Sequence, residues 1–284
     1  MILIIGATGT NGSELIRQLT AAGVKVRAMT RQPEKAADLG RLGVEVVAGD
    51  LDRPPTLAAA MAGCEKAFVV SSVDERFPAR LANAWAAARQ AGVKHVVKLS
   101  ALGAADDSPA VILRMHAETD AALRASGLAW TILRPNSFHQ NLLFSAHTIR
   151  EQGAFYMPLG DAKQSLIDVR DIGEVAAKAL TTDGHAGQTY ELTGPESLTY
   201  HDVARHLGEA LGKPVRYVNV PVAAARDAMA GMGLPAWTAD AVAEIYGHFA
   251  TGAAAGVTDT VRRVTGRAPT PFSQWARHHA AAFR

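Results

Sequence analysis

The sequence has little of several features that mark particular classes of protein. Its 284 residues include a single cysteine, Cys64, which excludes an intramolecular disulfide framework and fits a reducing compartment. No apolar run is long enough to cross a bilayer, and no basic segment precedes the first apolar residues as in a secretory signal. Lys and Arg number 29 against 27 Asp and Glu, so the net charge is only +2 and no nucleic-acid-binding stripe is indicated. We therefore expect a soluble, cytoplasmic protein that binds neither nucleic acid nor membranes.

Histidines at metal-ligand spacing are lacking too, because His278 and His279 form the one close pair, and we expect no metal site. What the chain does have is a normal supply of apolar residues. They make up 48% of the sequence and charged residues 20%, which is enough for a packed core. The length fits one large α/β domain, or such a domain with a smaller appendage.

The strongest local signal lies at the N-terminus, in the stretch MILIIGATGTNG. The apolar run Ile2–Ile5 predicts a buried parallel strand, and an amphipathic helix pattern begins directly after the glycines. In this order Gly6 permits a tight turn, Gly9 lets a pyrophosphate approach the backbone, and Gly12 lets helix and strand pack closely. An ordinary glycine turn is the alternative, but strand, turn and helix follow one another as dinucleotide binding requires.

Strand-like runs alternate with helical patterns through the first half of the chain, which predicts a doubly wound parallel sheet in an α/β fold. The predicted strands are Ile2–Ile5, Val24–Ala28, Val44–Val47, Lys66–Val70, His95–Leu99 and Ala129–Leu133. Predicted helices begin at Gly12–Ser13, carry Leu81, Trp85 and Ala88, and open at Ser108–Pro109 with a cap and an N1 proline.

The regular alternation ends after Pro135. Residues 136–165 are predicted to be rich in loops, and residues after 195 to be mostly helical. Between them we predict strands at Leu166–Val169 and Gln188–Thr193, a helix capped by Asp171, and a helix with a capping box at Thr199 and Asp202 that ends near Gly212. We therefore expect a nucleotide-binding domain of residues 1–135 and 166–194, with a small, discontinuous, mostly helical C-terminal substrate domain of residues 136–165 and 195–284.

Two further stretches favour a dinucleotide, and NADPH among the dinucleotides. Asp50, in the stretch GDLD after the third strand, can meet an adenine edge or can instead cap the next helix. The second strand lacks the acid at its end that usually binds the ribose hydroxyls of NAD. Arg31 and Lys35 stand there instead and can bind a 2′-phosphate, although Arg and Lys are more often solvated surface charges.

Several longer motifs resemble the atypical short-chain dehydrogenase/reductases of the NmrA-like group. They are GATGTNG at 6–12, TRQPEK at 30–35, GDLD at 49–52, KLSALGA at 98–104, HAETDAALRASGLAWTILRPNSFHQN at 116–141, LIDVRDIGEVAAKAL at 166–180 and TGRAPTPFSQWARHHAAAF at 265–283. The resemblance covers essentially the whole chain and implies a Rossmann-like domain with a small C-terminal substrate domain. Members of the group include NADPH-dependent quinone and triphenylmethane-dye reductases, and regulators that bind NADP without turnover.

The resemblance also implies a set of residues that bind NADPH or NADP+. They are Gly6, Thr8, Gly9, Thr10, Asn11, Gly12, Arg31, Lys35, Asp50, Leu51, Ser71, Ser72, His116, Pro135, Asn136, Ser137 and Phe138. A pocket for a flat substrate is expected from the aromatic and imidazole side chains of Phe138, His139, Phe144, Tyr156, Trp237 and Tyr246. Aromatic residues at such spacing are more often ordinary core, and this alternative remains open.

The wider superfamily uses a Ser, Tyr and Lys triad, and this sequence departs from it. Ser100 matches the serine, Ile112 falls on the tyrosine position, and His116 falls on the lysine position. Ser100 and His116 are therefore the catalytic candidates. Ser100 can bond a substrate carbonyl or merely cap the next segment, whereas His116 can bond the nicotinamide ribose, donate a proton, or be a half-buried structural histidine.

The missing acid has a chemical consequence. A saturated ketone reduced by hydride becomes a strongly basic alkoxide and needs an acid nearby, whereas a quinone or cationic dye gives a delocalised anion or a neutral product. We therefore predict an NADPH-dependent oxidoreductase for a quinone-like or conjugated aromatic acceptor. The rivals are an NADP-binding redox-sensing regulator and a nucleotide-sugar epimerase or dehydratase, the latter disfavoured because the Tyr–Lys pair is absent. The sequence leaves the acceptor, the stereochemistry and the oligomeric state open.

Overall fold

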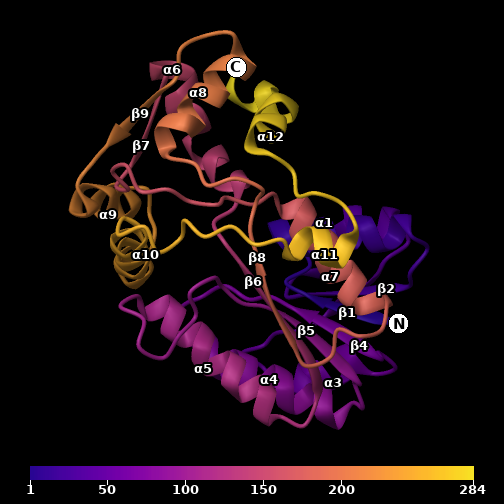
Figure 1. Ribbon diagram of the computed structural model, residues 1–284. Coiled ribbons are helices and arrows are strands. Elements are labelled where there is room, and N and C mark those ends of the chain that lie inside the picture. Colours follow the sequence, from indigo (N-terminus) through magenta and orange to yellow (C-terminus); the bar gives the residue numbers. More distant parts are fainter. The chain divides into compact units, whose positions relative to one another are not determined.

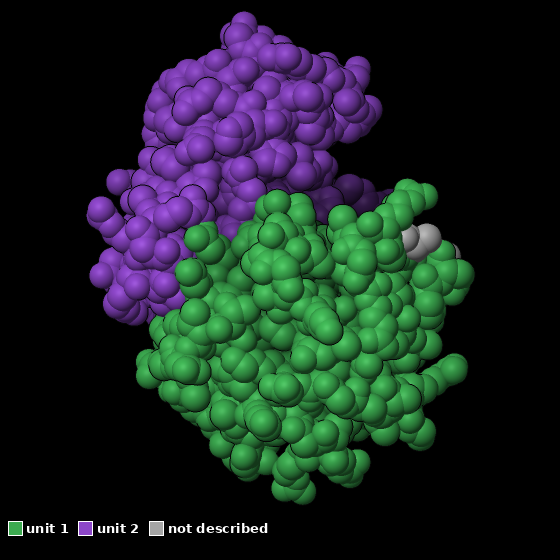
Figure 2. Space-filling model, turned by 90° about the vertical axis from the view of Figure 1, so that its right-hand side faces the viewer, with its two compact units in different colours: residues 1–106, 115–134, 172–190 green, residues 107–114, 135–171, 191–284 purple. Residues whose placement is uncertain are grey.

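The chain divides into two compact units in the computed structural model, which describes the side chains of residues 1–34, 36 and 38–284 (Figure 2). Unit 1 comprises residues 1–106, 115–134 and 172–190, and unit 2 comprises residues 107–114, 135–171 and 191–284. The domain bounds predicted from the sequence remain a proposal about how the protein is organised.

A seven-stranded sheet in the order β3-β2-β1-β4-β5-β6-β8 forms the centre of unit 1 (Figure 1). Its strands are β1 (Ile2–Ile5), β2 (Val26–Thr30), β3 (Glu45–Ala48), β4 (Lys66–Val69), β5 (His95–Leu99), β6 (Ala129–Pro135) and β8 (Gln188–Leu192). The pairs from β3 through β6 are parallel, and β1 lies between β2 and β4. The chain therefore winds outward from β1 in both directions, which confirms the predicted doubly wound, Rossmann-like α/β fold.

Helices cover both faces of this sheet (Figure 1). One face carries α3 (Pro55–Met61), α4 (Phe77–Gln90) and α5 (Val111–Ala125), whose apolar side chains share one core with β1, β4 and β6. The other face carries α1 (Thr10–Ala21) and α7 (Val169–Thr181), which approach closely because Gly173 leaves room for the side chain of Gln18. A short helical segment, η1 (Pro33–Ala36) with α2 (Ala37–Arg41), leads from β2 to β3.

Unit 2 is mostly helical and holds a small sheet of its own. The helical elements are η2 (His139–Ser145), α6 (Ala146–Gln152), α8 (Tyr200–Leu211), α9 (Val222–Gly231), α10 (Ala236–Phe249), α11 (Thr260–Thr265), α12 (Phe272–His279) and η3 (Ala280–Phe283). Strands β7 (Ala154–Met157) and β9 (Arg216–Asn219) pair in parallel, which the sequence analysis did not predict. The aromatic rings of Phe272, Trp275 and Phe283 are fully buried and form the centre of this unit.

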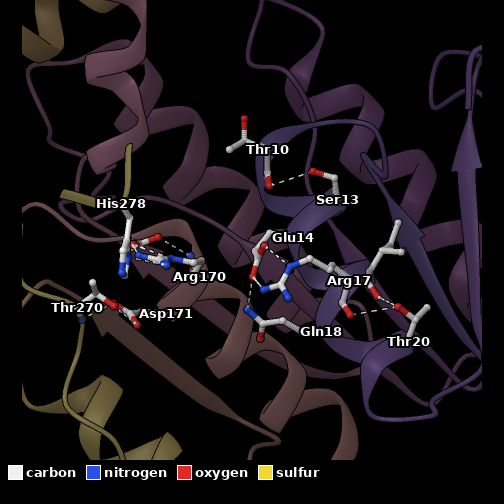
Figure 3. Close-up of polar contacts among 12 residues, drawn as sticks. Thr10, Ser13, Glu14, Arg17, Gln18, Thr20, Arg170, Asp171, Thr270 and His278 are labelled. Carbon is white, nitrogen blue, oxygen red and sulfur yellow. Dashed lines mark hydrogen bonds and ion pairs between the residues drawn. The ribbon is translucent and has the colours of Figure 1, made fainter. Parts of the chain in front are cut away.

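Two predictions about the segment before α7 are wrong. Residues 166–169 form no strand, because Ile167 makes a single bridge to Phe138 and the helix already begins at Val169. Asp171 does not cap this helix either. The backbone N–H of Arg170 donates to Asp168 at 2.9 Å, while Asp171 accepts from the N–H and hydroxyl of Thr270 at 2.7 and 3.1 Å (Figure 3). The apolar run was therefore a buried connection whose backbone bonds to loops, and the carboxylate of Asp171 holds the C-terminal segment in place.

The other helix ends follow the predicted signals more closely. The capping box of Thr199 and Asp202 is present, and α8 ends at Gly212 with a φ of +68°. The helix predicted to open at Ser108 begins three residues later at Val111, so the predicted N1 position of Pro109 and cap at Ser108 are wrong. Of the described helices, none is both long and apolar enough to cross a membrane.

Two glycines of the N-terminal loop are required by the fold itself. Gly6 has a φ of +80°, and a Cβ there would come within 2.5 Å of the Val70 carbonyl oxygen. At Gly12 a Cβ would stand 2.2 Å from the carbonyl oxygen of Gly6. The predicted turn and the predicted close packing of helix against strand are both confirmed.

We expect Gly12→Ala to destabilise the protein by about 1–3 kcal/mol, because the clash is with backbone that cannot rotate away. The measurement is the free energy of unfolding in urea. Gly247→Ala is the matched control, since nothing lies within 4 Å of a Cβ placed there in α10. Equal stability of Gly12→Ala and the control would contradict this explanation of the loop.

Candidate functional site

The glycine-rich loop leads directly into the first turn of α1. Gly9 is the N-cap residue and makes no side-chain cap, and Ser13 donates from its backbone to the Gly9 carbonyl oxygen (2.9 Å) and from its hydroxyl to the Thr10 carbonyl oxygen (3.3 Å; Figure 3). The N–H groups of this turn precede the helix's own hydrogen-bond ladder and carry its positive dipole end. Such a turn is suited to bind the phosphates of a nucleotide.

Two observations test whether the loop fits a pyrophosphate. A Cβ on Gly9 would meet only the Gly6 carbonyl oxygen, at 3.4 Å, so Gly9 keeps open a space that the fold does not need. The side chain of Asn11 is buried, and its Oδ1 has no hydrogen-bond partner among the described residues. The open position at Gly9 fits a pyrophosphate, whereas the unpaired acceptor of Asn11 needs a donor, such as a hydroxyl or amide group elsewhere on a nucleotide. Thr8 and Thr10 are exposed on the same loop.

Arg31 follows β2 directly, is exposed, and lies close enough to Asp52 to help lower the pKa of that carboxyl. The main cause of the lowered pKa is a hydrogen bond from Arg80, and Arg76 also pairs with Asp52 at 3.1 Å. Three guanidinium groups therefore gather around one carboxylate, of which the sequence analysis identified only Arg31. The side chain of Lys35 lies outside the described residues.

The stretch after β3 forms a tight turn. Asp50 accepts a hydrogen bond on Oδ1 from the Asp52 N–H at 3.0 Å, and its own N–H donates to the Thr56 hydroxyl at 2.9 Å. Leu51 is buried, and its carbonyl oxygen accepts from Asn83 at 2.8 Å. The carboxylate of Asp50 therefore shapes the turn before α3, but α3 has no side-chain cap, so the alternative role of a helix cap is wrong.

At the carboxyl end of β4, Ser71 is half-buried and Ser72 is exposed, and the N–H of Val70 donates to the carbonyl oxygen of Ile5 at the end of β1. Ser100 follows β5, the next strand along the sheet. The glycine-rich loop, the two serines and Ser100 therefore follow the carboxyl ends of three adjacent strands, which is where doubly wound folds bind ligands.

Below Ser100 lies a buried polar cluster that the sequence analysis missed. Lys98 and Asp120 have fully buried side chains, and the ammonium donates to Asp120 Oδ1 at 2.5 Å. The other oxygen of Asp120 accepts from the Ser100 hydroxyl at 3.1 Å and from Arg134 at 2.8 and 3.1 Å. Because the one hydroxyl hydrogen of Ser100 is used in this bond, Ser100 is placed to act as a structural partner of Asp120. The only sequence signal was a lysine inside a strand that otherwise reads as buried.

His116 occupies a dry environment beside this cluster. The ring packs edge-on against Phe77 with centroids 4.9 Å apart, and its Nδ1 has no partner among the described residues. Its carbonyl oxygen accepts from Lys98 at 3.1 Å. Burial, helped by the charge of Lys98, lowers the pKa of His116 to about 3, so the imidazole is neutral at physiological pH. Ile112, one turn earlier on α5, is also buried.

The remaining predicted residues belong to unit 2 and differ widely in exposure. Asn136 is buried, and its amide donates to Ser165 and to the Ala254 carbonyl oxygen at 2.8 Å each. His139 is buried against the rings of Phe272 and Trp275, as in an ordinary core. By contrast, Phe144 is 90% exposed.

The other predicted cofactor and pocket residues of unit 2 are partly or largely exposed, except for Pro135. Tyr156 is exposed and bonds Gln152. Ser137, Phe138, Trp237 and Tyr246 are half-buried, and Pro135 is buried at the end of β6. Their part in cofactor or substrate binding stays a prediction.

No metal cluster among the described residues competes with this site, and a shallow surface depression in unit 2 lies apart from the predicted site residues. Within the described part of the chain, no three His, Cys, Asp or Glu side chains gather as ligands. A shallow depression of about 360 Å³ lies between the end of α8 and β9, lined by residues such as Arg205, Gly208 and Lys213. None of the predicted site residues lines it.

The chain matches a known protein family and a named relative over nearly its full length. A sequence model described as the NmrA-like family matches residues 1–274. An NAD(P)H azoreductase of Xenophilus azovorans is 47% identical over 283 residues, covering 100% of this chain and 99% of the relative.

Two solved structures are similar over nearly the whole chain. An NADPH-dependent quinone oxidoreductase of Escherichia coli, complexed with NADPH, is 32% identical with a TM-score of 0.88, covering 98% of this chain and 99% of the other. A triphenylmethane reductase of Citrobacter sp., complexed with NADP(H), is 29% identical with a TM-score of 0.85 and the same coverage.

We expect Gly9→Ala to fold normally but to weaken NADPH binding roughly tenfold or more, since the added methyl would stand where the pyrophosphate approaches. Calorimetric titration with NADPH gives the affinity, and thermal unfolding without cofactor gives the stability. Gly231→Ala, whose Cβ would meet nothing within 4 Å, is the control. Native affinity in Gly9→Ala would show that the phosphates lie elsewhere.

Proposed function

This chain belongs to the NmrA-like family, and on that premise we propose that it is an NADPH-dependent oxidoreductase that delivers hydride directly to a conjugated acceptor. The predictions of an oxidoreductase and of NADPH as cofactor agree with the relatives, which are named as azo, quinone and triphenylmethane reductases. The observation that carries the choice of acceptor is the acid-free site. An isoleucine stands at the tyrosine position, and a buried neutral imidazole stands one turn away.

When bound, NADPH supplies the hydride, and the protein contributes binding, orientation and exclusion of water. The first turn of α1 and the open position at Gly9 would bind the pyrophosphate, and Arg31 would bind the 2′-phosphate. His116, with its Nδ1 unpaired in a dry environment, would orient the reacting groups through a hydrogen bond as a neutral ring. These roles require no proton donor among the described residues of the site.

An acceptor for such a site must tolerate hydride addition without an acid. Quinones and azo compounds satisfy this requirement because resonance spreads the charge that the hydride brings, whereas the alkoxide from a saturated ketone keeps it on one oxygen. A spectrophotometric screen of NADPH oxidation over quinones, azo dyes, cationic dyes and saturated ketones tests the proposal. Turnover of conjugated acceptors alone supports it. Binding of NADPH without turnover of any acceptor would favour the alternative, an NADP-binding regulator.

We expect Arg31→Ala to lose about 1–3 kcal/mol of NADPH binding while NADH binding barely changes, because only NADPH carries the 2′-phosphate. Titration calorimetry with both cofactors measures the difference. Arg41→Ala, at an exposed arginine of α2 paired with Asp38, is the control. Equal losses for NADPH and NADH in Arg31→Ala would assign the phosphate to other residues.

We expect the rate of quinone reduction to be flat between about pH 5 and 7. The pKa of His116 is lowered to about 3, so the ring is already neutral throughout this range and loses no proton as the pH rises. His116→Gln, which cannot titrate, should lower kcat but keep the same profile. A rate that falls with a pKa near 6.5 in the wild type, and not in His116→Gln, would identify His116 as the proton donor.

A further inference from the structure

The buried cluster of unit 1 carries an unbalanced charge. Lys98 and Arg134 are two cations, and the one carboxylate between them belongs to Asp120. The ammonium of Lys98 uses its three hydrogens on Asp120, the Thr119 hydroxyl and the His116 carbonyl oxygen, at 2.5, 2.6 and 3.1 Å. Burial lowers the pKa of Lys98 to about 8, so it remains charged at neutral pH. The cluster therefore holds a net charge of +1, with Lys98 and Asp120 shielded from solvent and the side chain of Arg134 17% exposed.

The cluster also lies at the chemically relevant edge of the sheet. Lys98 is the fourth residue of β5, and Ser100, which bonds Asp120, is the first residue beyond that strand. His116 is bonded to Lys98 through its backbone, so both catalytic candidates contact the cluster directly. One cation would balance the charge of one carboxylate, so the second cation, besides bonding Asp120, leaves the cluster with an excess positive charge.

We propose that the cluster of Lys98, Asp120 and Arg134 selects acceptors by charge, stabilising the anion that forms when a neutral acceptor takes up hydride. The inference rests on the proposed function and deepens it, because it makes neutral quinones and azo compounds the preferred substrates over cationic dyes. Preorganised charge in a low-dielectric site is the kind of interaction that lowers such barriers most. The three residues act through space and through Ser100 and His116, so they are positioning and electrostatic groups.

The balance of charge explains the selectivity. In each turnover a C–H bond of the reduced cofactor breaks, and its proton and two electrons form a new bond to the acceptor. A neutral acceptor becomes an anion, which then takes a proton from water, whereas a cationic dye becomes neutral. Positive charge nearby therefore favours the first reaction and opposes binding and reduction of a cation. The sign of the effect must differ between the two acceptor classes.

The test compares kcat/KM for a neutral para-quinone with kcat/KM for a cationic triphenylmethane dye in one set of variants. Lys98→Met and Arg134→Gln each reduce the cluster charge from +1 to zero, from opposite sides of Asp120. We expect the quinone-to-dye ratio to fall roughly tenfold in both, the size of one unit charge acting over about 10 Å at an effective dielectric of about 20. The quinone rate should fall, and the dye rate should hold or rise.

Two further variants separate charge from packing. The double variant Lys98→Met/Asp120→Asn loses one cation and the carboxylate together, so it returns to +1 and should recover the wild-type ratio. Lys66→Met is the matched control. Lys66 is a half-buried lysine at the start of the neighbouring strand β4, bonded to the Leu180 carbonyl oxygen at 2.7 Å, and its loss should leave the ratio unchanged. If Lys98→Met does not fold, Arg134→Gln and the double variant still decide the matter.

A second measurement needs no turnover. A nitrophenol, coloured only when ionised, is added to the NADP+ complex as a mimic of the anionic product, and its bound pKa is read by absorbance. The cluster should hold that pKa below its value in water, and Lys98→Met should raise it by about 1 unit. An unchanged ratio and an unchanged nitrophenol pKa in all folded variants would overturn the proposal. Absence of NADPH oxidation with every acceptor in the wild type would instead refute the proposed function itself.

Discussion

The carboxylate of Asp120 is fully buried, and it can remain there as an anion only because Lys98, Ser100 and Arg134 replace the water it has lost. These partners come from β5, from the residue after it, and from β6, while Asp120 itself lies on α5. One ionised group therefore ties two adjacent strands to the helix that covers them. Removing a single partner from such a cluster costs about 3–5 kcal/mol when it leaves a buried charge uncompensated. The position of α5, and with it that of His116, depends on this arrangement.

The same constraint shapes the proposed chemistry. Burial that forces Asp120 to pair with cations also keeps His116 neutral, because its ring has lost water and lies close to Lys98. A neutral imidazole orients rather than protonates, and Ile112 offers no proton at the position where the superfamily has a tyrosine. The site is then dry, acid-free and close to a net positive charge. Conjugated neutral acceptors are the substrates that such an environment can serve.

The glycine-rich loop shows how one motif separates fold from function. Gly6 and Gly12 are needed because a side chain at either position would strike backbone, whereas Gly9 leaves a space that the chain does not fill. The unpaired Oδ1 of Asn11 also indicates a binding role, because a buried acceptor needs a donor and a bound molecule can supply one. The loop is therefore complete as structure, and its remaining features concern binding.

The sequence by itself determined the alternation of strands and helices, the glycine turn and the family. These depend on local periodicity and on motifs that are contiguous in the chain. It also predicted a departure from the catalytic triad at Ile112 and His116, by counting along one helix. It failed at Leu166–Val169, where burial made a connection look like a strand, and at β7 and β9, whose pairing joins residues about 60 positions apart. Only the tertiary structure brought Lys98, Asp120 and Arg134 together, because no local pattern specifies which charges from separate elements share one buried space.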